Sequence, residues 1–536
     1  MQSNMMDRPL MLDHLVERAG QLFPTVEVVS QMPDKSLRRH TYRDVLRRVR
    51  SLAAGLRRAG LREGDRVATL MWNHHAHLEA YFGVPMAGGI YHTLNLRLAP
   101  EELAYIVNHA QDRFLIVDDV LLPLLERFAP EVKLEKVFVV QLAGKGTGGH
   151  EDYEALIDGG SDGFEPPPPD EKRAAGLCYT SGTTGHPKGV SYSHRALVLH
   201  TFASIMKDTL SVGQEDVVLP VVPQFHANAW GMPFACTMVG CKQVFPGPHL
   251  DPESLLDLYE KERVTLSAGV PTIWFGIQQA LEKEPSRWKL TPNMRMVVGG
   301  SAAPEAMIRK FDELGMQVIH AWGMTETTPL GSISTLKATL ADADEATKYR
   351  VRAKQGIAVP FVEMRVMGDE GPVPWDGKSM GELEVRGPWV AGSYFQTDEG
   401  KDKWTEDGWF RTGDVVTIDE HGYMHIADRT KDLIKSGGEW ISSVALENLL
   451  MAHPAVAEAA AIAIPDPKWG ERPLAVVVFH EGKSATPEEL REHLAPHFAK
   501  WALPDAFVVR DAIPRTSTGK FLKRALRDEY KDFDNG

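Results

Sequence analysis

Short apolar runs bounded by turn or polar residues recur along the chain, at residues 114–117, 137–140, 296–298 and 318–320. Between several of them lie segments whose apolar positions recur at helical spacing, such as residues 102–107 and 304–314. An alternation of strand-like and helix-like segments predicts an α/β fold with layered and largely parallel sheets.

The last hundred residues show a different pattern. Two further strand-like runs occupy residues 459–464 and 474–479. Thr486, Pro487 and Glu489 then supply an N-cap, a proline in the first turn and a capping-box acid, which together predict the start of a helix. We therefore expect a large N-terminal domain of layered sheets and helices, residues 1–430, and a small α+β C-terminal domain, residues 431–536.

Length and charge narrow the classes of function. A chain of 536 residues exceeds the ~250–300 residues at which a single core stops growing, so two or more domains are expected. The net charge is −14, and a nucleic-acid partner is not expected because such partners require a basic face. No window reaches the ~18 consecutive apolar residues of a membrane span, and the start of the chain lacks a signal-peptide pattern. We expect a cytoplasmic protein that is not an integral membrane protein; the sequence leaves peripheral membrane association open.

Two glycine motifs favour loops over binding sites. Residues 144–149 satisfy G-x-G-x-x-G, but the acidic residue of a dinucleotide site would fall in the Gly/Pro-rich stretch 158–172. Residues 159–163 satisfy G-x-S-x-G, but no apolar strand precedes them, as a hydrolase nucleophile elbow requires. Both segments are predicted to be surface loops.

Histidine and cysteine residues do not form a clear metal motif. His74, His75 and His77 follow Asn73, a predicted N-cap, and are expected on an exposed first helical turn rather than around a metal. The chain has three cysteines, which is too few for a disulfide framework and fits a reducing compartment. Cys236 and Cys241 lie in an apolar stretch and are predicted to be buried thiols.

The most informative segment combines glycines, hydroxyls and a lysine: Tyr179-Thr180-Ser181-Gly182-Thr183-Thr184-Gly185-His186-Pro187-Lys188-Gly189. Glycines let the backbone approach a ligand closely, and the hydroxyls and Lys188 add donors for phosphate oxygens. It is not a Walker A loop, because Pro187 stands where that pattern needs its second glycine. The composition alone fits a phosphate-binding loop and a polar surface turn equally well.

Further motifs follow in a fixed order. They are Gly300-Ser301-Ala302-Ala303-Pro304, Trp322-Gly323-Met324-Thr325-Glu326, Trp409-Phe410-Arg411-Thr412-Gly413-Asp414, Asp428-Arg429-Thr430-Lys431-Asp432 and Pro514-Arg515-Thr516-Ser517-Thr518-Gly519-Lys520. Together with the glycine-rich segment, this ordered set resembles the adenylate-forming superfamily, which includes acyl-CoA synthetases, carrier-protein adenylation domains and luciferases. The resemblance covers nearly the whole chain.

The resemblance implies an ATP site with Mg²⁺, and the residue types agree with it. Glu326 offers a hard oxygen for Mg²⁺, and Asp414 can accept both ribose hydroxyls. Lys188 and Lys520 neutralise phosphate charge, so these two lysines and Glu326 are the expected catalytic residues. The expected ATP/AMP-binding residues are Thr180, Ser181, Gly182, Thr183, Thr184, Gly185, Lys188, Gly300, Ser301, Ala302, Trp322, Gly323, Thr325, Glu326, Asp414 and Arg429.

Two positions depart from the common pattern of the superfamily. Most relatives have tyrosine at the position of Trp322, so stacking on adenine is kept while a hydrogen bond from a tyrosine hydroxyl is lost. Relatives usually have glycine at the position of Asp428. A group of fatty acyl-CoA synthetases shares this aspartate and the continuation Lys435-Ser436-Gly437-Gly438-Glu439-Trp440, and the chain is most similar to that group.

The resemblance also implies a mobile C-terminal domain. Lys520 would bridge the acid's carboxylate and the α-phosphate during adenylation, and rotation about a hinge at Lys431 would then withdraw it. The same rotation would bring the segment from Lys435 to Trp440 to the site, where Ser436, Gly437, Gly438 and Glu439 complete the expected coenzyme A contact. Lys520, Lys523, Arg524 and Arg527 form a basic cluster that fits either a polyanion contact or a solvated helix face.

The acyl pocket implied by the resemblance is formed by His226, Trp230, Gly299, Gly323 and Met324. Acetate-specific relatives have tryptophan at the position of Gly323, so glycine is expected to leave room for a longer acid. Trp230 is the candidate gate of an acyl tunnel; a plain core aromatic is the simpler alternative.

The predicted function is an AMP-forming acyl-CoA synthetase that uses ATP and coenzyme A on a medium- or long-chain fatty acid. A CoA ligase for a short acid such as 3-(methylthio)propionate is the first alternative. A carrier-protein adenylation domain is the second, although the end at Gly536 leaves no room for a carrier domain. A nucleotide-binding pseudoenzyme is disfavoured because Glu326, Asp414 and Lys520 are all present. A homodimer through the N-terminal domain is expected from the resemblance alone.

Overall fold

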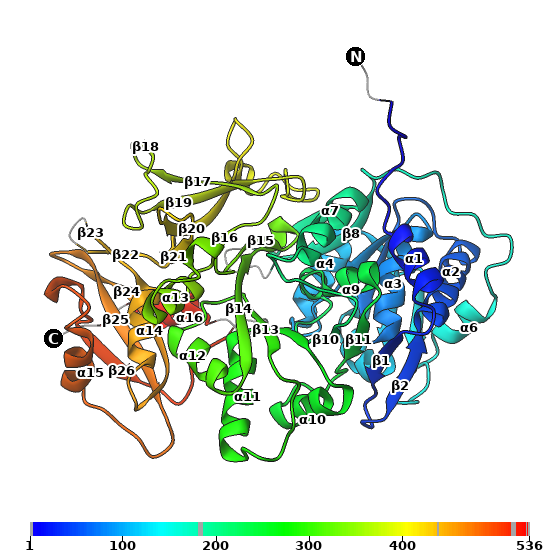
Figure 1. Cartoon of the computed structure of the whole chain (residues 1–536). Helices are drawn as coiled ribbons and strands as arrows, with labels where there is room; N and C mark the ends of the chain where they lie inside the picture. Colours follow the sequence, from blue (N-terminus) through cyan, green and yellow to red (C-terminus); the bar gives the residue numbers. More distant parts are fainter. Residues whose placement is uncertain (1–3, 181–185, 437–438, 516–520, 532, 534–536) are drawn as a thin grey trace.

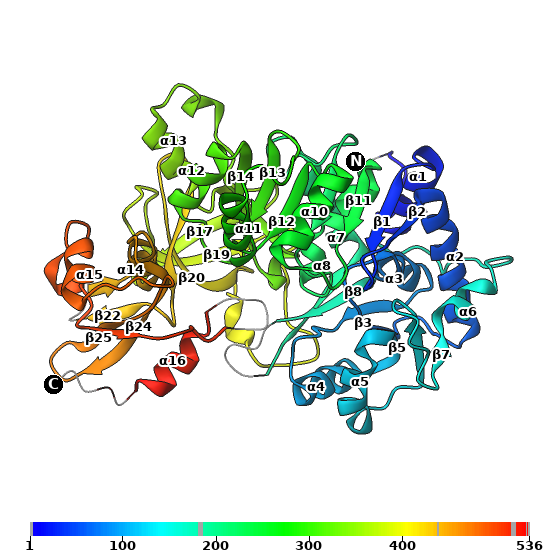
Figure 2. The ribbon, with the colours of Figure 1, turned by 90° about the horizontal axis from the view of Figure 1, so that it is seen from below.

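The computed structural model describes residues 4–180, 186–436, 439–515, 521–531 and 533. In this part of the chain the strands form four sheets (Figure 1). Three sheets are built by residues up to Arg429, which we call the large lobe, and the fourth by residues from Ile434 onward, the small lobe. Figures 1 and 2 both place the orange and red small lobe at the opposite end of the molecule from the blue N-terminal helices.

The first sheet of the large lobe is parallel at its centre and antiparallel at both edges. In spatial order its strands are β16 (Ile357–Ala358), β15 (Leu330–Ile333), β14 (Met316–Gly323), β13 (Met294–Val298), β12 (Leu266–Gly269), β10 (Val217–Pro220), β11 (Lys242–Phe245), β1 (Glu27–Gln31) and β2 (Leu37–Thr41). The predicted strands at 296–298 and 318–320 are confirmed as parts of β13 and β14.

The second sheet is parallel except for the pair β8 and β9. Its strands are β7 (Glu151–Asp152), β6 (Lys136–Val140), β5 (Asp112–Asp118), β3 (Arg66–Leu70), β4 (Ile90–Thr93), β8 (Ala174–Tyr179) and β9 (Gly189–Ser193). The predicted strands at 114–117 and 137–140 are confirmed as parts of β5 and β6.

Helices connect and cover these two sheets. They are α1 (Asp13–Leu22), α2 (Tyr42–Arg58), α3 (His75–Met86), α4 (Pro100–Ala110), α5 (Leu122–Phe128), α6 (Tyr153–Asp158), α7 (His194–Ile205), α8 (Ala227–Trp230), α9 (Met232–Val239), α10 (Pro252–Glu262), α11 (Pro271–Lys283), α12 (Glu305–Glu313) and α13 (Glu345–Arg352). The predicted helices at 102–107 and 304–314 are confirmed by α4 and α12. Residues 144–149 and 159–163 contain no helix or strand, as predicted.

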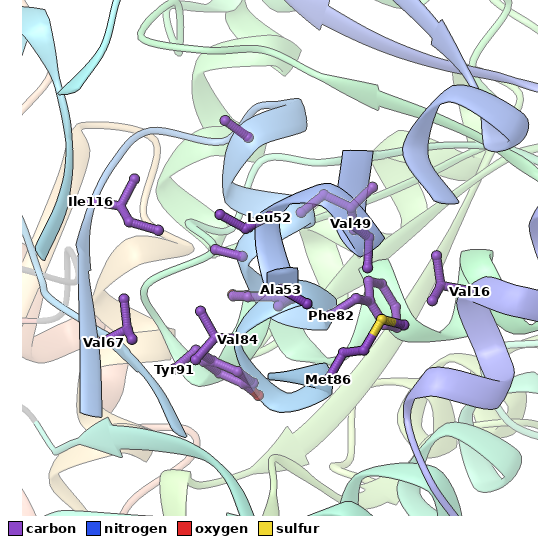
Figure 3. Close-up of a cluster of buried hydrophobic side chains, with 14 of the residues drawn as sticks. Val16, Val49, Leu52, Ala53, Val67, Phe82, Val84, Met86, Tyr91 and Ile116 are labelled. Carbon is purple, nitrogen blue, oxygen red and sulfur yellow. The ribbon is translucent and has the colours of Figure 1, made fainter. Parts of the chain in front are cut away.

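One apolar cluster joins both parallel sheets, because it combines side chains of α1, α2 and α3 with residues of strands from each sheet. Helix α2 begins at a capping box formed by Thr41 and Asp44, and its buried residues recur at helical spacing. Figure 3 shows Val49 and Leu52 of this helix packed toward Phe82 of α3. Burial of this apolar face supplies most of the stability of the lobe.

The histidines near the start of α3 correct one prediction. His74, not Asn73, is the N-cap residue, and His74, His75 and His77 are buried rather than exposed. His74 lies 2.8 Å from a carboxylate oxygen of Asp118, so it is held by a structural pair. Local sequence could not reveal that β1 and β2 cover this turn.

Among the described residues, one group of metal-type ligands lies close together, namely His40, His75 and Glu79. The carboxylate of Glu79 is already used, because it accepts hydrogen bonds from Arg48 at 2.6 Å and from Tyr153 at 2.8 Å. The carboxylate of Glu79 is thus committed to these two partners, whereas Nδ1 of His40 is buried without a hydrogen-bond partner in the described part of the chain.

The third sheet is antiparallel, unlike the first two. Its strands are β18 (Gly371–Pro372), β17 (Glu363–Gly368), β19 (Gly381–Arg386), β20 (Phe410–Ile418) and β21 (Met424–Arg429). β21 ends two residues before Lys431, so this sheet stands next to the connection between the lobes.

The small lobe packs three helices on a mixed sheet, which agrees with the predicted α+β unit. Its elements are β22 (Ile434–Ser436), β23 (Glu439–Ile441), β24 (Val456–Asp466), β25 (Gly470–Phe479), β26 (Ala506–Val509), α14 (Ser443–Met451), α15 (Pro487–Leu494) and α16 (Lys523–Glu529). The capping box predicted for Thr486 and Glu489 is confirmed at the start of α15. Across the described residues of both lobes, no helix combines the length and the apolar character of a membrane span.

Candidate active site

A cavity of about 1340 Å³ lies between the lobes and receives residues from both. In the large lobe it opens at the carboxyl ends of the parallel strands β12, β13 and β14, where ligands of α/β proteins commonly bind. Sequence-predicted residues that line this one cavity are Thr180, Lys188, His226, Trp230, Gly299, Gly300, Ser301, Ala302, Trp322, Gly323, Met324, Thr325, Glu326, Asp414, Arg429 and Lys431.

Several predicted residues cannot be placed. Ser181, Gly182, Thr183, Thr184 and Gly185 lie outside the described residues, as do Gly437, Gly438 and Lys520. Residues on either side of Lys520 are described, and both Arg515 and Phe521 line the cavity.

Trp322 and Asp414 are hydrogen-bonded to each other across the cavity wall. The indole Nε1–H of Trp322 donates to Oδ2 of Asp414 at 2.8 Å, although the two residues are 92 positions apart. Arg429 approaches the other oxygen of the same carboxylate, with Nε 3.2 Å from Oδ1. The tryptophan that replaces the usual tyrosine therefore keeps a polar contact, which could not be foreseen from the sequence. This arrangement suits an adenosine group, because the aromatic face can stack on adenine while the carboxylate accepts hydrogen bonds from the ribose hydroxyls.

Glu326 is a buried carboxylate in the turn Thr325–Thr327, which follows β14. Tyr394 donates a hydrogen bond to its Oε1 at 2.7 Å. Burial raises the pKa of Glu326 above its usual range, against the hydrogen bond from Tyr394 and the attraction of Arg429 and Lys403. The negative charge of ionised Glu326 is only partly compensated by its neighbours, so a divalent cation would stabilise it. The hard carboxylate oxygens suit Mg²⁺.

Lys188 and Thr180 stand at the two ends of the glycine-rich segment, held together by the β8–β9 pair. The backbone N–H of Thr180 donates to the carbonyl of Lys188 at 2.9 Å, and the N–H of Lys188 donates to Oγ1 of Thr180 at 3.2 Å. The Lys188 ammonium lies 3.5 Å from Glu399 and 5.9 Å from the centre of the Tyr394 ring. Tyr394 thus contacts both the candidate metal ligand and the candidate phosphate lysine.

Tyr394 lines the cavity and was not predicted from the sequence. It follows Gly392 and Ser393 in a segment without periodicity, so no local signal separates it from a core aromatic. Only a match of the surrounding segment to a family pattern would have identified Tyr394 from the sequence.

The apolar end of the cavity is formed around Trp230. Leu210, Met232, Val270, Phe275 and Val297 line the cavity there and were not predicted from the sequence. A Cβ atom built on Gly299 would lie 3.1 Å from the Trp230 ring, so the indole packs directly on that glycine. Trp230 is only partly buried, and it ends a turn in which residues 227–231 all have positive φ.

The space beside Gly323 differs from the expectation. A Cβ atom at this position would lie 1.8 Å from the carbonyl oxygen of Pro329. The backbone of the following loop, not open pocket, therefore fills the side on which a larger residue would project.

Of the segment expected to contact coenzyme A, the described residues Lys435, Ser436, Glu439 and Trp440 do not line the cavity. Lys435 is exposed and lies 5.6 Å above the ring of Trp440, its partner in the β22–β23 pair. Ser436 is buried and accepts a hydrogen bond from Arg472 at 3.0 Å. Glu439 begins β23.

Two members of the basic cluster near the C-terminus form close ion pairs within the protein. Lys523 is largely buried and lies 2.6 Å from Glu447, and Arg527 lies 2.5 Å from Asp432. Arg524 is exposed, with a distant acidic neighbour, Asp528, at 3.8 Å. For the described members of the cluster, neither a free polyanion site nor a fully solvated helix face fits, because Lys523 and Arg527 bind carboxylates; Lys520 lies outside the described residues.

The fold and the cavity define a class: an enzyme that holds a nucleotide beside a carboxylic acid, as adenylate-forming enzymes do. Comparison with protein families gives the same result. Residues 16–395 match the AMP-binding enzyme model, and residues 445–520 match the AMP-binding enzyme C-terminal domain. The chain belongs to the AMP-binding enzyme family.

Two curated relatives span the whole chain. It is 52% identical over 537 residues to a long-chain-fatty-acid–CoA ligase of Thermus thermophilus, covering 100% of this chain and 98% of that protein. It is 46% identical to a 3-methylmercaptopropionyl-CoA ligase of Ruegeria lacuscaerulensis, covering 99% of each. Among solved structures, an anthranilate CoA ligase in complex with anthranoyl-AMP has a TM-score of 0.86 at 25% identity, with 98% of each chain covered.

Proposed function

We propose that this enzyme activates a medium- or long-chain fatty acid with ATP and transfers the acyl group to coenzyme A. The observation that carries the proposal is that one cavity joins the Trp322–Asp414 nucleotide wall to an apolar end around Trp230. The 52% identity to a long-chain ligase supports the same substrate class.

In the first half-reaction, a carboxylate oxygen of the acid attacks the α-phosphorus of ATP. The bond to the bridging oxygen breaks, and pyrophosphate leaves with its electron pair. Lys188 holds phosphate charge, and Trp322 and Asp414 fix the adenosine so that the two anions meet in line. Bound Mg²⁺, held by Glu326, would supply further neutralisation of the triphosphate.

In the second half-reaction, the sulfur of coenzyme A attacks the acyl carbonyl. The bond between the acyl carbon and the AMP oxygen breaks, AMP leaves, and the thiol proton passes to solvent. No side chain of this protein needs to form a covalent intermediate. Trp230 and the apolar residues around it hold the acyl chain and exclude water from the mixed anhydride.

We further propose that the two half-reactions use two positions of a C-terminal domain, residues 431–536, that turns about Lys431. In support, Lys431 lies between the last strand of the large lobe and the first strand of the small lobe. Lys520 would act in the first half-reaction, and Lys435, Ser436, Gly437, Gly438, Glu439 and Trp440 in the second.

The experiment that tests the proposed function is a pyrophosphate-release assay with acids from about C2 to C18, with and without coenzyme A. A fatty acyl-CoA synthetase gives highest kcat/KM with medium or long chains, and acyl-CoA forms in equal amount to pyrophosphate. Highest kcat/KM with 3-(methylthio)propionate would establish the second candidate, which the 46% identical relative favours. Adenylation without transfer to coenzyme A would contradict both and support a carrier-protein adenylation domain.

The proposal also covers the oligomeric state and the cellular compartment of the protein. A homodimer through the large lobe rests on the resemblance to fatty acyl-CoA synthetases alone. Sedimentation at micromolar concentration tests it, and a monomer would contradict it. We propose a cytoplasmic location, where the three free, buried cysteines stay reduced.

A further inference from the structure

Asp428 is a carboxylate of the large lobe whose partners come mainly from the small lobe. It lies near the end of strand β21 and is 1% exposed. Its Oδ2 accepts a hydrogen bond at 2.5 Å from the backbone N–H of Ser443, the first residue of α14. A carboxylate at a helix N-terminus satisfies a free N–H and interacts favourably with the helix dipole. The second contact between the same elements is the hydroxyl of Ser442, which donates to the carbonyl of Ala427.

A lysine of the last helix completes this junction. Lys523 of α16 has only 10% of its side chain exposed, and its ammonium donates to Oγ of Ser443 at 2.6 Å and lies 2.6 Å from Oε1 of Glu447. Burial lowers the pKa of Lys523, but the attraction of Glu447 and Asp428 outweighs it, and the net shift is upward. Asp428 and Lys523 therefore stabilise each other's charge across the boundary between the lobes.

The charges at the junction are not balanced. Of the two buried carboxylates, Glu447 pairs with the ammonium of Lys523 directly, whereas Asp428 is attracted by it at longer range. Burial raises the pKa of both carboxyls, that of Glu447 to about 7, and the attraction of Lys523 opposes this in each case. An ionised Asp428 thus depends on Lys523 and on the N-terminus of α14. If α14 moved away, Asp428 would keep the hydrogen bond from the N–H of Arg429 at 2.7 Å, which belongs to its own lobe, and lose the one from Ser443.

The docked position of α14 and α16 also determines what faces the cavity. Arg515 and residues 521–524 line the cavity. Residues 521 and 522 lead directly into α16, so fixing Lys523 against α14 fixes these two residues as well.

We propose that Asp428 is a positioning residue that latches α14 and α16 onto the large lobe and thereby favours the arrangement used for adenylation over that used for thioester formation. The link to the half-reactions rests on the proposed function, whereas the latch itself rests on the contacts of Asp428. The latch gives a role to Asp428, at a position where the sequence alone shows only that aspartate replaces the usual glycine.

The first test measures the positions of the lobes without any substrate. Spin labels are attached to Asp342→Cys and Glu481→Cys, which are exposed positions on the large and small lobe, while the three native cysteines are buried. Wild type should give one dominant label–label distance. Asp428→Asn, which keeps size and a hydrogen-bond acceptor but removes the charge, should raise the undocked population about tenfold. Lys523→Met should act in the same direction and decides the question if Asp428→Asn does not fold.

Glu529→Gln is the matched control. Glu529 lies on the same helix α16 and pairs with Arg510 of the small lobe at 2.6 Å, so its replacement removes an acidic group without touching the boundary. Its distance distribution should equal that of wild type.

The second test compares the half-reactions. Asp428→Asn should lower ATP–pyrophosphate exchange about tenfold relative to thioester formation from supplied acyl-adenylate.

A distance distribution equal to wild type in both Asp428→Asn and Lys523→Met would overturn the latch. The distance measurement needs no acid substrate, so absence of acyl-CoA formation with every acid would contradict the proposed function without affecting the test of the latch.

Discussion

The hydrogen bond from Tyr394 to Glu326 gives a sharp test of the metal site. Tyr394→Phe removes one hydroxyl and keeps the aromatic ring that faces Lys188. The bond is 2.7 Å long, part-buried and charge-assisted. Hydrogen bonds to charged groups contribute about 1.5–3 kcal/mol, which corresponds to roughly 10–150-fold in an equilibrium constant.

The sign of the pH effect follows from the structure. The phenol stabilises the ionised form of Glu326, whose pKa burial already raises. Without the phenol the protonated form is favoured further, and only the ionised form binds Mg²⁺ well. The half-saturating Mg²⁺ concentration in ATP–pyrophosphate exchange should therefore rise about tenfold or more at pH values below the pKa of Glu326, and the acid limb of the rate profile should move to higher pH.

The assay measures ATP–pyrophosphate exchange against Mg²⁺ concentration between about pH 6 and pH 9. Tyr349→Phe is the control, because Tyr349 donates to the carboxylate of Asp312 at 2.8 Å and does not line the cavity. The control should behave as wild type. An unchanged Mg²⁺ requirement at every pH in Tyr394→Phe would refute the role of Glu326 as the buried metal ligand.

Other expected outcomes concern separate parts of the molecule. Lys520→Ala should reduce adenylation by ~10²–10³ or more and spare thioester formation from supplied acyl-adenylate, and equal loss in both half-reactions would argue against domain alternation. Trp230→Ala should keep or raise kcat/KM for long acids and weaken discrimination among chain lengths, measured across an acid series; an unchanged profile in a variant destabilised by ~3–5 kcal/mol would show a plain core residue. Burial raises the pKa of Asp13 to about 7, so the folded protein loses stability as this carboxyl ionises. Asp13→Asn should therefore raise the melting temperature by about 1–2 °C above neutral pH and have little effect near pH 4. Equal melting temperatures of variant and wild type at pH 8 would contradict this.

Local patterns were enough to predict the layered α/β lobe, several of its strands and the capping box of α15. Each of these signals lies within a few consecutive residues, so it survives without knowledge of the tertiary structure. The ordered motifs also predicted which residues face one cavity, because strand ends and the turns that follow them supply most of those side chains.

Contacts between distant segments could not be predicted in the same way. Trp322 and Asp414 are 92 positions apart, and nothing near either one indicates their hydrogen bond. Lys523 was expected on a basic surface, yet it is largely buried against Glu447, which belongs to a helix that starts 80 positions earlier. The burial of His74 and its neighbours likewise depends on strands that a local pattern does not place.

The left-handed turn at residues 227–231 has a consequence for engineering the enzyme. Four of its residues carry side chains, and a left-handed helical residue costs roughly 1–2 kcal/mol compared with a right-handed one. Packing around the turn must therefore offset this cost. Glycine at Ala227 or Ala229 would relieve the cost and loosen the wall that Trp230 forms. A mutant library limited to those two alanines would then sample pockets of different depth while leaving the nucleotide half of the cavity untouched.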